Sequence, residues 1–61
     1  MYTTMFVLHK SDANRNFSIT NPPHIPRKGE EINCCRVVDV DYCFRDYGTD
    51  IERLEVTLAV E

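Results

Sequence analysis

The feature that most constrains this fold is the strict alternation of apolar and polar residues in two segments. In residues 35–44 the even positions from 38 onward are apolar: Val38, Val40, Tyr42 and Phe44. The odd positions between them hold Asp39, Asp41 and Cys43. Within residues 51–61, the positions 54, 56, 58 and 60 are Leu, Val, Leu and Val, and polar or small residues separate them. Because successive side chains of a strand point to opposite faces, this period predicts two strands that are each buried on one face.

Three further segments have strand character. Residues 2–9 are rich in Thr, Val and aromatic residues, and both faces of such a strand would be largely apolar, which is typical of a central strand or of a subunit contact. Residues 17–20 and 30–32 predict two short strands. The pair Val37-Val38 interrupts the alternation after Cys35 and indicates a β-bulge. A helix from residue 50 to 58 is the alternative reading of the last segment, but the run 56–60 favours a strand.

The connections between these strands are polar or rich in proline. Residues 10–16 contain many turn formers, and residues 45–50 resemble a hairpin connection. Pro22, Pro23 and Pro26 lack N–H donors, so residues 21–26 predict a rigid loop that pairs with no strand. A chain of 61 residues has room for one small core. We therefore expect one all-β domain, residues 1–61, in which a five-stranded, strongly twisted antiparallel sheet closes into a barrel and so removes its edges.

One motif links the proline-rich loop to the long strand. Pro26-x-x-Gly29-Glu30-x-Ile32, followed by Val37-Val38-x-Val40, resembles the P-x-x-G-D-x-I … V-x-x-V pattern of SH3-like small barrels and of short proteins encoded by phages and mobile elements. The resemblance covers about half the chain and implies an SH3-like barrel. The chain lacks the later glycine-rich turn of nucleic-acid-binding barrels, which argues against RNA binding.

Several classes of protein are disfavoured by composition. The chain has no apolar run of the roughly 20 residues that span a bilayer and no secretion signal, so we expect a cytoplasmic protein without membrane contact. Cys34, Cys35 and Cys43 are an odd number with an adjacent pair, which predicts free thiols, mainly in core positions, rather than a disulfide framework. No zinc-ligand spacing is present, and neither a metal nor a cofactor is expected.

Charge is distributed unevenly along the chain. The net charge is −3, but residues 1–29 contain four basic residues and one acidic residue, whereas residues 30–61 contain three basic and nine acidic residues. The basic residues of the first part lie in or beside two loops, where guanidinium and ammonium groups can hold a phosphate or carboxylate. Tyr47, at the predicted hairpin tip, and Tyr2 are expected to be exposed and able to stack on a base, whereas Tyr42 and Phe44 are expected in the core. The predicted ligand-binding residues are Lys10, Arg15, His24, Arg27, Lys28 and Tyr47. The alternative is that these loop charges only keep the protein soluble.

These observations predict a non-enzymatic binding module. His9 and His24 are expected at the surface, and their spacing supports no catalytic dyad with a cysteine. The module is expected to be a homo-oligomer that associates through the first strand or the open edge of the last strand. Its partner is a nucleotide, another anionic small molecule or a host protein, as in a phage counter-defence protein that sequesters a nucleotide signal or blocks a defence protein. The alternatives are a structural or regulatory protein-interaction domain without a small ligand, and a nucleic-acid-binding barrel.

Overall fold

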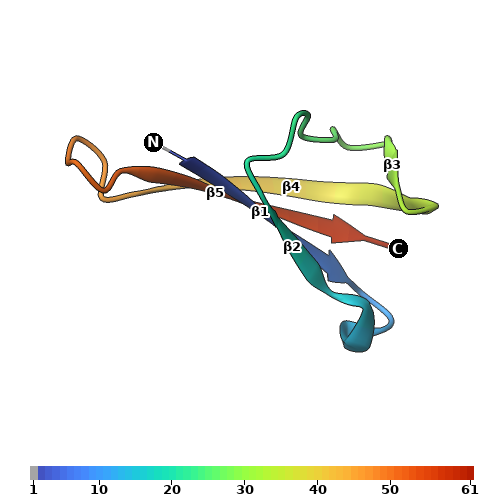
Figure 1. Ribbon diagram of the computed structural model, residues 1–61. Helices are drawn as coiled ribbons and strands as arrows, with labels where there is room; N and C mark the ends of the chain where they lie inside the picture. The colour runs from blue at the N-terminus through green and yellow to red at the C-terminus, as the bar shows by residue number, and fades with distance from the viewer. Residues whose placement is uncertain (1) are drawn as a thin grey trace.

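The computed structural model describes residues 2–61, which form five β-strands and one turn of 3-10 helix (Figure 1). The strands are β1 (Tyr2–His9), β2 (Phe17–Thr20), β3 (Glu31–Ile32), β4 (Cys35–Arg45) and β5 (Arg53–Val60), and the 3-10 turn η1 is Ala13–Arg15. The described residues include no α-helix. The all-β class is therefore confirmed, and each strand begins and ends within two residues of its predicted bounds.

The strands form one sheet in the order β2-β1-β5-β4-β3. β1 pairs parallel with β5, whereas the other three pairings are antiparallel. The prediction of an antiparallel sheet is therefore wrong, because the strands are mixed. The sheet is strongly curled, as a half-barrel, but it stays open. The prediction that the last strand has an open edge is also wrong, since β5 lies between β1 and β4.

The two outermost strands, β2 and β3, are consecutive in the chain but do not pair with each other. Residues 21–30 connect them, and the prolines of this segment cannot donate to a ladder. The segment instead packs its side chains against the core: Pro26 is buried and Ile25 is half-buried. Two hydrogen bonds attach Asn21, the first residue of the segment, to β1. The Asn21 Oδ1 accepts from the Thr3 N–H at 3.0 Å, and the Asn21 N–H donates to the Thr3 carbonyl at 2.6 Å. Side-chain packing therefore covers the gap that strand pairing leaves open.

The core lies on the inner face of the curled sheet. The parallel register sets Met5 beside Val56 and Val7 beside Leu58, and none of the four is more than 1% exposed. Further apolar residues of β2, β3, β4 and β5 and of the proline-rich segment pack around them: Phe17, Ile19, Ile25, Ile32, Cys35, Val37, Val40, Leu54 and Val60. Burial of this apolar face, at about 25 cal/mol per Å², is the main force that holds the small sheet together.

The predicted β-bulge is confirmed. The pairing of β4 with β5 shifts between Val37, which faces Val60, and Asp39, which faces Ala59, so Val38 is the extra residue. Bulges bend the strand that contains them. β4 packs on the core as far as Val40, whereas its residues 41–45 are exposed.

Two burial predictions are wrong. Tyr42 and Phe44 lie on the inner face but are 60% and 53% exposed, because β4 and β5 extend past the residues that cover the core. His9, which was expected at the surface, is 9% exposed beside Phe17, and its Nδ1 has no hydrogen-bond partner among residues 2–61. His9 shares the inward face of β1 with Met5 and Val7, which explains its burial.

The cysteines were expected mainly in core positions, and this prediction is confirmed for one of the three. Cys35 is buried, whereas Cys34 and Cys43 are exposed, and all three thiols are free. Asn33 and Cys34 form the two-residue loop between β3 and β4, with φ angles of 50° and 65°. Positive φ at both positions is the mark of a type I′ hairpin turn, which usually has glycine second. Cys34 is therefore exposed because it occupies a turn rather than a strand.

Candidate anion-binding site

The two basic loops lie at the same end of the sheet, where β1 and β5 end and β4 begins (Figure 1). The Lys10 N–H donates to the Val60 carbonyl at 3.1 Å, and the Gly29 N–H donates to the Val37 carbonyl at 2.8 Å. Val60 and Val37 face each other in the sheet. Lys10 and Gly29 are therefore connected across the sheet through Val60 and Val37. This path covers three strand spacings, which is about 14 Å on a flat sheet.

Arg15 reaches from the first loop toward the other side of the sheet. Asp12 caps η1, because its Oδ1 accepts from the Asn14 N–H at 3.1 Å and its carbonyl accepts from the Arg15 N–H at 3.1 Å. The Arg15 guanidinium then lies 3.7 Å from the Cys35 Sγ at the start of β4. The short helical turn thus holds a cation beside the first residue of the long strand.

The second loop ends in a turn that Glu30 stabilises. The Glu30 N–H donates to the Arg27 carbonyl at 2.9 Å, and its Oε1 accepts from the Arg27 N–H at 2.6 Å. The same oxygen lies 3.3 Å from the His24 Nε2. These contacts, first the Arg27 amide and then His24, lower the pKa of the Glu30 carboxyl below its ordinary value. Gly29, at φ 95°, supplies the left-handed backbone that closes the turn.

A pocket of about 300 Å³ lies between this turn and β4, and it is lined by Lys28, Gly29, Arg36, Val37 and Val38. The Arg36 guanidinium donates to the Glu61 Oε1 at 3.1 Å, and Glu31 lies opposite Arg36 in the β3–β4 pair. Lys28 has no carboxylate within ion-pair distance among residues 2–61. The pocket thus combines one unpaired ammonium, one guanidinium and an apolar wall, which suits an anion that carries a small apolar group.

Ion pairs separate the cations into two classes. All three arginines of residues 30–61 pair with carboxylates: Arg36 with Glu61, Arg45 with Glu55, and Arg53 with both Asp46 and Glu55. The hydrogen bond from Arg45, followed by the charges of Arg45 and Arg53, lowers the pKa of Glu55. Among residues 2–61, no such pair involves Lys10, Arg15, Arg27 or Lys28. The positive charge that is not neutralised therefore lies at the loop end of the sheet.

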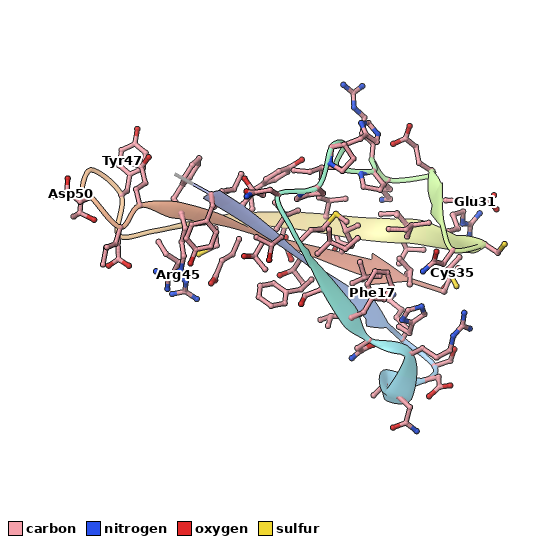
Figure 2. All side chains as sticks on the ribbon, viewed as in Figure 1. Phe17, Glu31, Cys35, Arg45, Tyr47 and Asp50 are labelled. Carbon is pink, nitrogen blue, oxygen red and sulfur yellow. The ribbon has the colours of Figure 1, made fainter. Side chains whose placement is uncertain are left out.

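Five of the six predicted site residues belong to the two loops at this end of the sheet, but only one of them lines the pocket. Lys28 lines the pocket and Arg27 is its neighbour in the turn, whereas Lys10 and Arg15 belong to the other loop, three strand spacings away. His24 pairs with Glu30 instead of facing the pocket lining. Tyr47, 73% exposed, lies in the hairpin loop beyond the other end of β4 (Figure 2). Ten residue steps along β4 separate the two ends by about 33 Å, so Tyr47 and Lys28 of one chain cannot contact the same small ligand.

Sequence reasoning missed the pocket residues of β4. Arg36 is the single cation beside the predicted bulge at Val37-Val38, and this position was a usable signal. A bulge redirects side chains locally and is common at binding sites.

The structure adds two observations on other chemistry. Residues 2–61 contain no group of three or more His, Cys, Asp or Glu side chains placed to hold a metal ion. Within the same residues, no helix is long and apolar enough to cross a membrane.

Comparison of the chain with protein-family models, with characterised proteins and with solved structures gave no match.

Proposed function

We propose that this protein is a non-enzymatic binding module that holds a small anionic ligand, with a nucleotide as the ligand class, in the pocket between the 26–29 turn and β4. The observation that carries the proposal is the unpaired Lys28 ammonium beside Arg36 and the apolar Val37-Val38 wall. A phosphate would accept hydrogen bonds from both cations, and Arg36 would exchange Glu61 for the ligand. The apolar wall would contact the sugar or base.

The size of the pocket supports a small ligand. At about 300 Å³ it is at the lower end of the range of small-molecule sites, which begins near 300 Å³. Buried Pro26 and the Glu30 contacts hold the turn before a ligand arrives, which reduces the ordering cost of binding. Sequestration of a nucleotide signal in a phage counter-defence role is the specific form of this proposal that the resemblance to phage-encoded proteins favours.

Calorimetric titration with inorganic phosphate and with nucleoside monophosphates tests the proposal. Lys28→Glu should abolish binding, and Arg36→Gln should weaken it by about tenfold to a hundredfold, the range for loss of a hydrogen bond to a charged group. Lys10→Glu is the matched control, because it makes the same change of charge at the same end of the sheet but outside the pocket lining. If Lys10→Glu and Lys28→Glu weaken binding equally, the ligand responds to general charge and the pocket is not its site.

A second candidate function is supported by a different observation. Among residues 2–61, no strand pairs with the outer edge of β4 from Val38 to Arg45. Such an edge can bind a protein partner by strand addition, without a small ligand. Asp39→Lys combined with Asp41→Lys should then disrupt partner binding, whereas Lys28→Glu should not. Affinity for long oligonucleotides that falls steeply with salt would instead support the nucleic-acid-binding alternative.

A further inference from the structure

The free edge of β4 begins immediately after the bulge. Before the bulge, Arg36 exchanges backbone hydrogen bonds with Glu61, whereas Val37 directs its N–H and C=O outward to Glu30 and Gly29. After Val38 the register with β5 resumes at Asp39. Since the N–H and C=O groups of alternate residues point to opposite sides of a strand, the groups of the even-numbered residues point away from β5. Those residues are Val40, Tyr42 and Phe44.

One contact supports this orientation. The Val40 N–H donates to the Oδ1 of the neighbouring Asp39 at 3.0 Å, instead of to β5. A backbone donor that is capped by the adjacent side chain is not part of a ladder. The edge therefore presents unpaired backbone groups on the even residues, and Asp39 covers one of them.

We propose that a second copy of this chain pairs with this edge, with β4 antiparallel to β4 of the partner about a twofold axis at Tyr42. Seven residues, 39–45, lie between the bulge and the hairpin turn, and Tyr42 is their midpoint. In this register every even residue faces an even residue, so the outward N–H and C=O groups satisfy each other across the axis. The contact is isologous, as closed dimers require.

The side chains of this register are complementary on both faces. On the outer face Asp39 faces Arg45 of the partner subunit, and this pair occurs twice because of the symmetry. On the inner face Val40 faces Phe44 of the partner subunit, and the two Tyr42 rings meet at the axis. Opposite charges and aromatic–aliphatic pairs are the combinations that stabilise paired strands. Arg45 already binds Glu55 at 3.0 Å, and its five donors allow a second carboxylate.

Neighbouring registers fit less well. A shift that puts Asp41 on the axis sets two carboxylates against each other, which is unfavourable. A shift that puts Cys43 on the axis pairs only residues 41–45, because the chain turns at Asp46, where φ is 51°. The register about Tyr42 is the one that uses the whole free edge.

The exposed aromatic residues near this edge of β4 support its being covered by a partner. Tyr42 and Phe44 are large side chains on a strand whose inner face is covered at this end by no other part of residues 2–61. Tyr47 packs against Phe44 edge to face, with ring centroids 5.4 Å apart, and so extends the aromatic surface into the hairpin loop. Grouped exposed aromatic side chains of this kind mark interaction surfaces.

The dimer brings the two ends of the molecule together. In the proposed register the position opposite Val37 is that of Tyr47 of the partner subunit. The outward N–H and C=O of Val37 already form hydrogen bonds with Glu30 and Gly29, so the partner's β4 cannot pair with Val37. The pairing must therefore end at Arg45 of the partner subunit, which is where β4 ends. The partner's hairpin loop, residues 46–52, then lies beside the 26–29 turn and the basic pocket. The proposed dimer does not depend on the proposed function, whereas a role for Tyr47 of the partner subunit in ligand binding does.

The first experiment measures association and its dependence on charge. Sedimentation velocity over a series of protein concentrations should show a species of twice the 7.1 kDa chain mass. Asp39→Arg and Arg45→Asp should each shift the protein toward monomer, whereas the double variant should restore the dimer, because it exchanges the charges of the same pair. Far-UV circular dichroism confirms that each variant is folded. A wild-type monomer at every concentration overturns the proposal, as does stronger association when Asp39 is replaced, since Asp39 would then protect the edge.

The second experiment tests the register and does not depend on affinity. Position 41 faces Cys43 of the partner subunit at a pair without hydrogen bonds, where Cα atoms lie about 4.5 Å apart, within disulfide range. Asp41→Cys in a Cys34→Ser background should therefore give a covalent dimer on mild oxidation, with 41–43 links found by peptide mapping. The same variant with Cys43→Ser should not form these links. A 43–43 link in the Cys34→Ser parent, or no cross-link in the Asp41→Cys variant, contradicts the register.

The two proposals fail separately. Loss of phosphate binding in Lys28→Glu with an intact dimer supports both. A dimer that binds none of the anions would refute the anion-binding pocket but not the β4–β4 contact. A monomer that binds phosphate would refute the β4–β4 contact but not the pocket. Tyr47→Ala should weaken nucleotide binding without weakening phosphate binding, because its ring would contact the base.

Discussion

The β3–β4 turn gives a direct test of the hairpin that starts β4. Cys34 occupies the second position of the type I′ turn at φ 65° and is exposed, so its side chain contributes no core packing. For a residue with a Cβ atom, the left-handed conformation is less favourable by roughly 1–2 kcal/mol. Glycine removes this cost but loses more chain entropy on folding, by roughly 0.5–1 kcal/mol. Cys34→Gly should therefore stabilise the protein by about 0.5–1 kcal/mol.

The assay is thermal unfolding followed by far-UV circular dichroism under reducing conditions. For a domain of this size, 1 kcal/mol shifts the midpoint by roughly 4–8 °C, so Cys34→Gly should raise it by about 2–8 °C. Cys34→Ala is the control, because it removes the thiol and keeps the Cβ atom, and its midpoint should stay near that of the wild type. If Cys34→Gly is no more stable than Cys34→Ala, residue 34 is not in the left-handed region, and the two-residue hairpin is refuted.

Two further predictions concern single polar groups. His9→Leu should stabilise the fold by about 1–3 kcal/mol in urea unfolding, because it removes a buried Nδ1 without a partner, whereas His9→Gln should give no gain. Glu30 has a pKa below the ordinary 4.5, so its contribution to the 26–29 turn is complete above that pH and is lost as the pH falls through the lower, folded-state pKa. The amide resonance of Arg27 should shift only in that acidic range, and Glu30→Gln should abolish the shift; a midpoint above 4.5 would contradict the contact.

The strands could be predicted from the sequence, but their order could not. Period-two alternation states which side chains share a face, and it located β4, β5 and the Val38 bulge. It does not state which strand lies beside which, so the parallel pairing of β1 with β5 was missed. The proline-rich segment was recognised as unable to pair, and in the structure it connects the two outer strands, β2 and β3, without forming a strand of its own.

The candidate site was predicted in part. The charge asymmetry identified the loop that contains Lys28, but Arg36 was missed because it belongs to a strand rather than to a basic loop. Tyr47 was assigned to the same site, although its distance from Lys28 depends on the length of β4, which loop composition does not reveal. Phe44 was assigned to the core because alternation identifies the inner face but not where the covering layer ends.

The parallel pairing of β1 with β5 has a consequence for how the chain folds. Each pair in this contact joins residues 51 positions apart, as in Tyr2 with Arg53. During synthesis β1 therefore emerges long before its central neighbour exists, and the edge of β1 that faces β5 stays unpaired until β5 has been made. The antiparallel pairs β1–β2 and β4–β5 are local in sequence and should form first, so that the parallel contact of β1 with β5 joins two preformed hairpins. Such long-range closure is slow and exposes intermediates to aggregation, so the rate-limiting step should be the arrival of the first strand at the last.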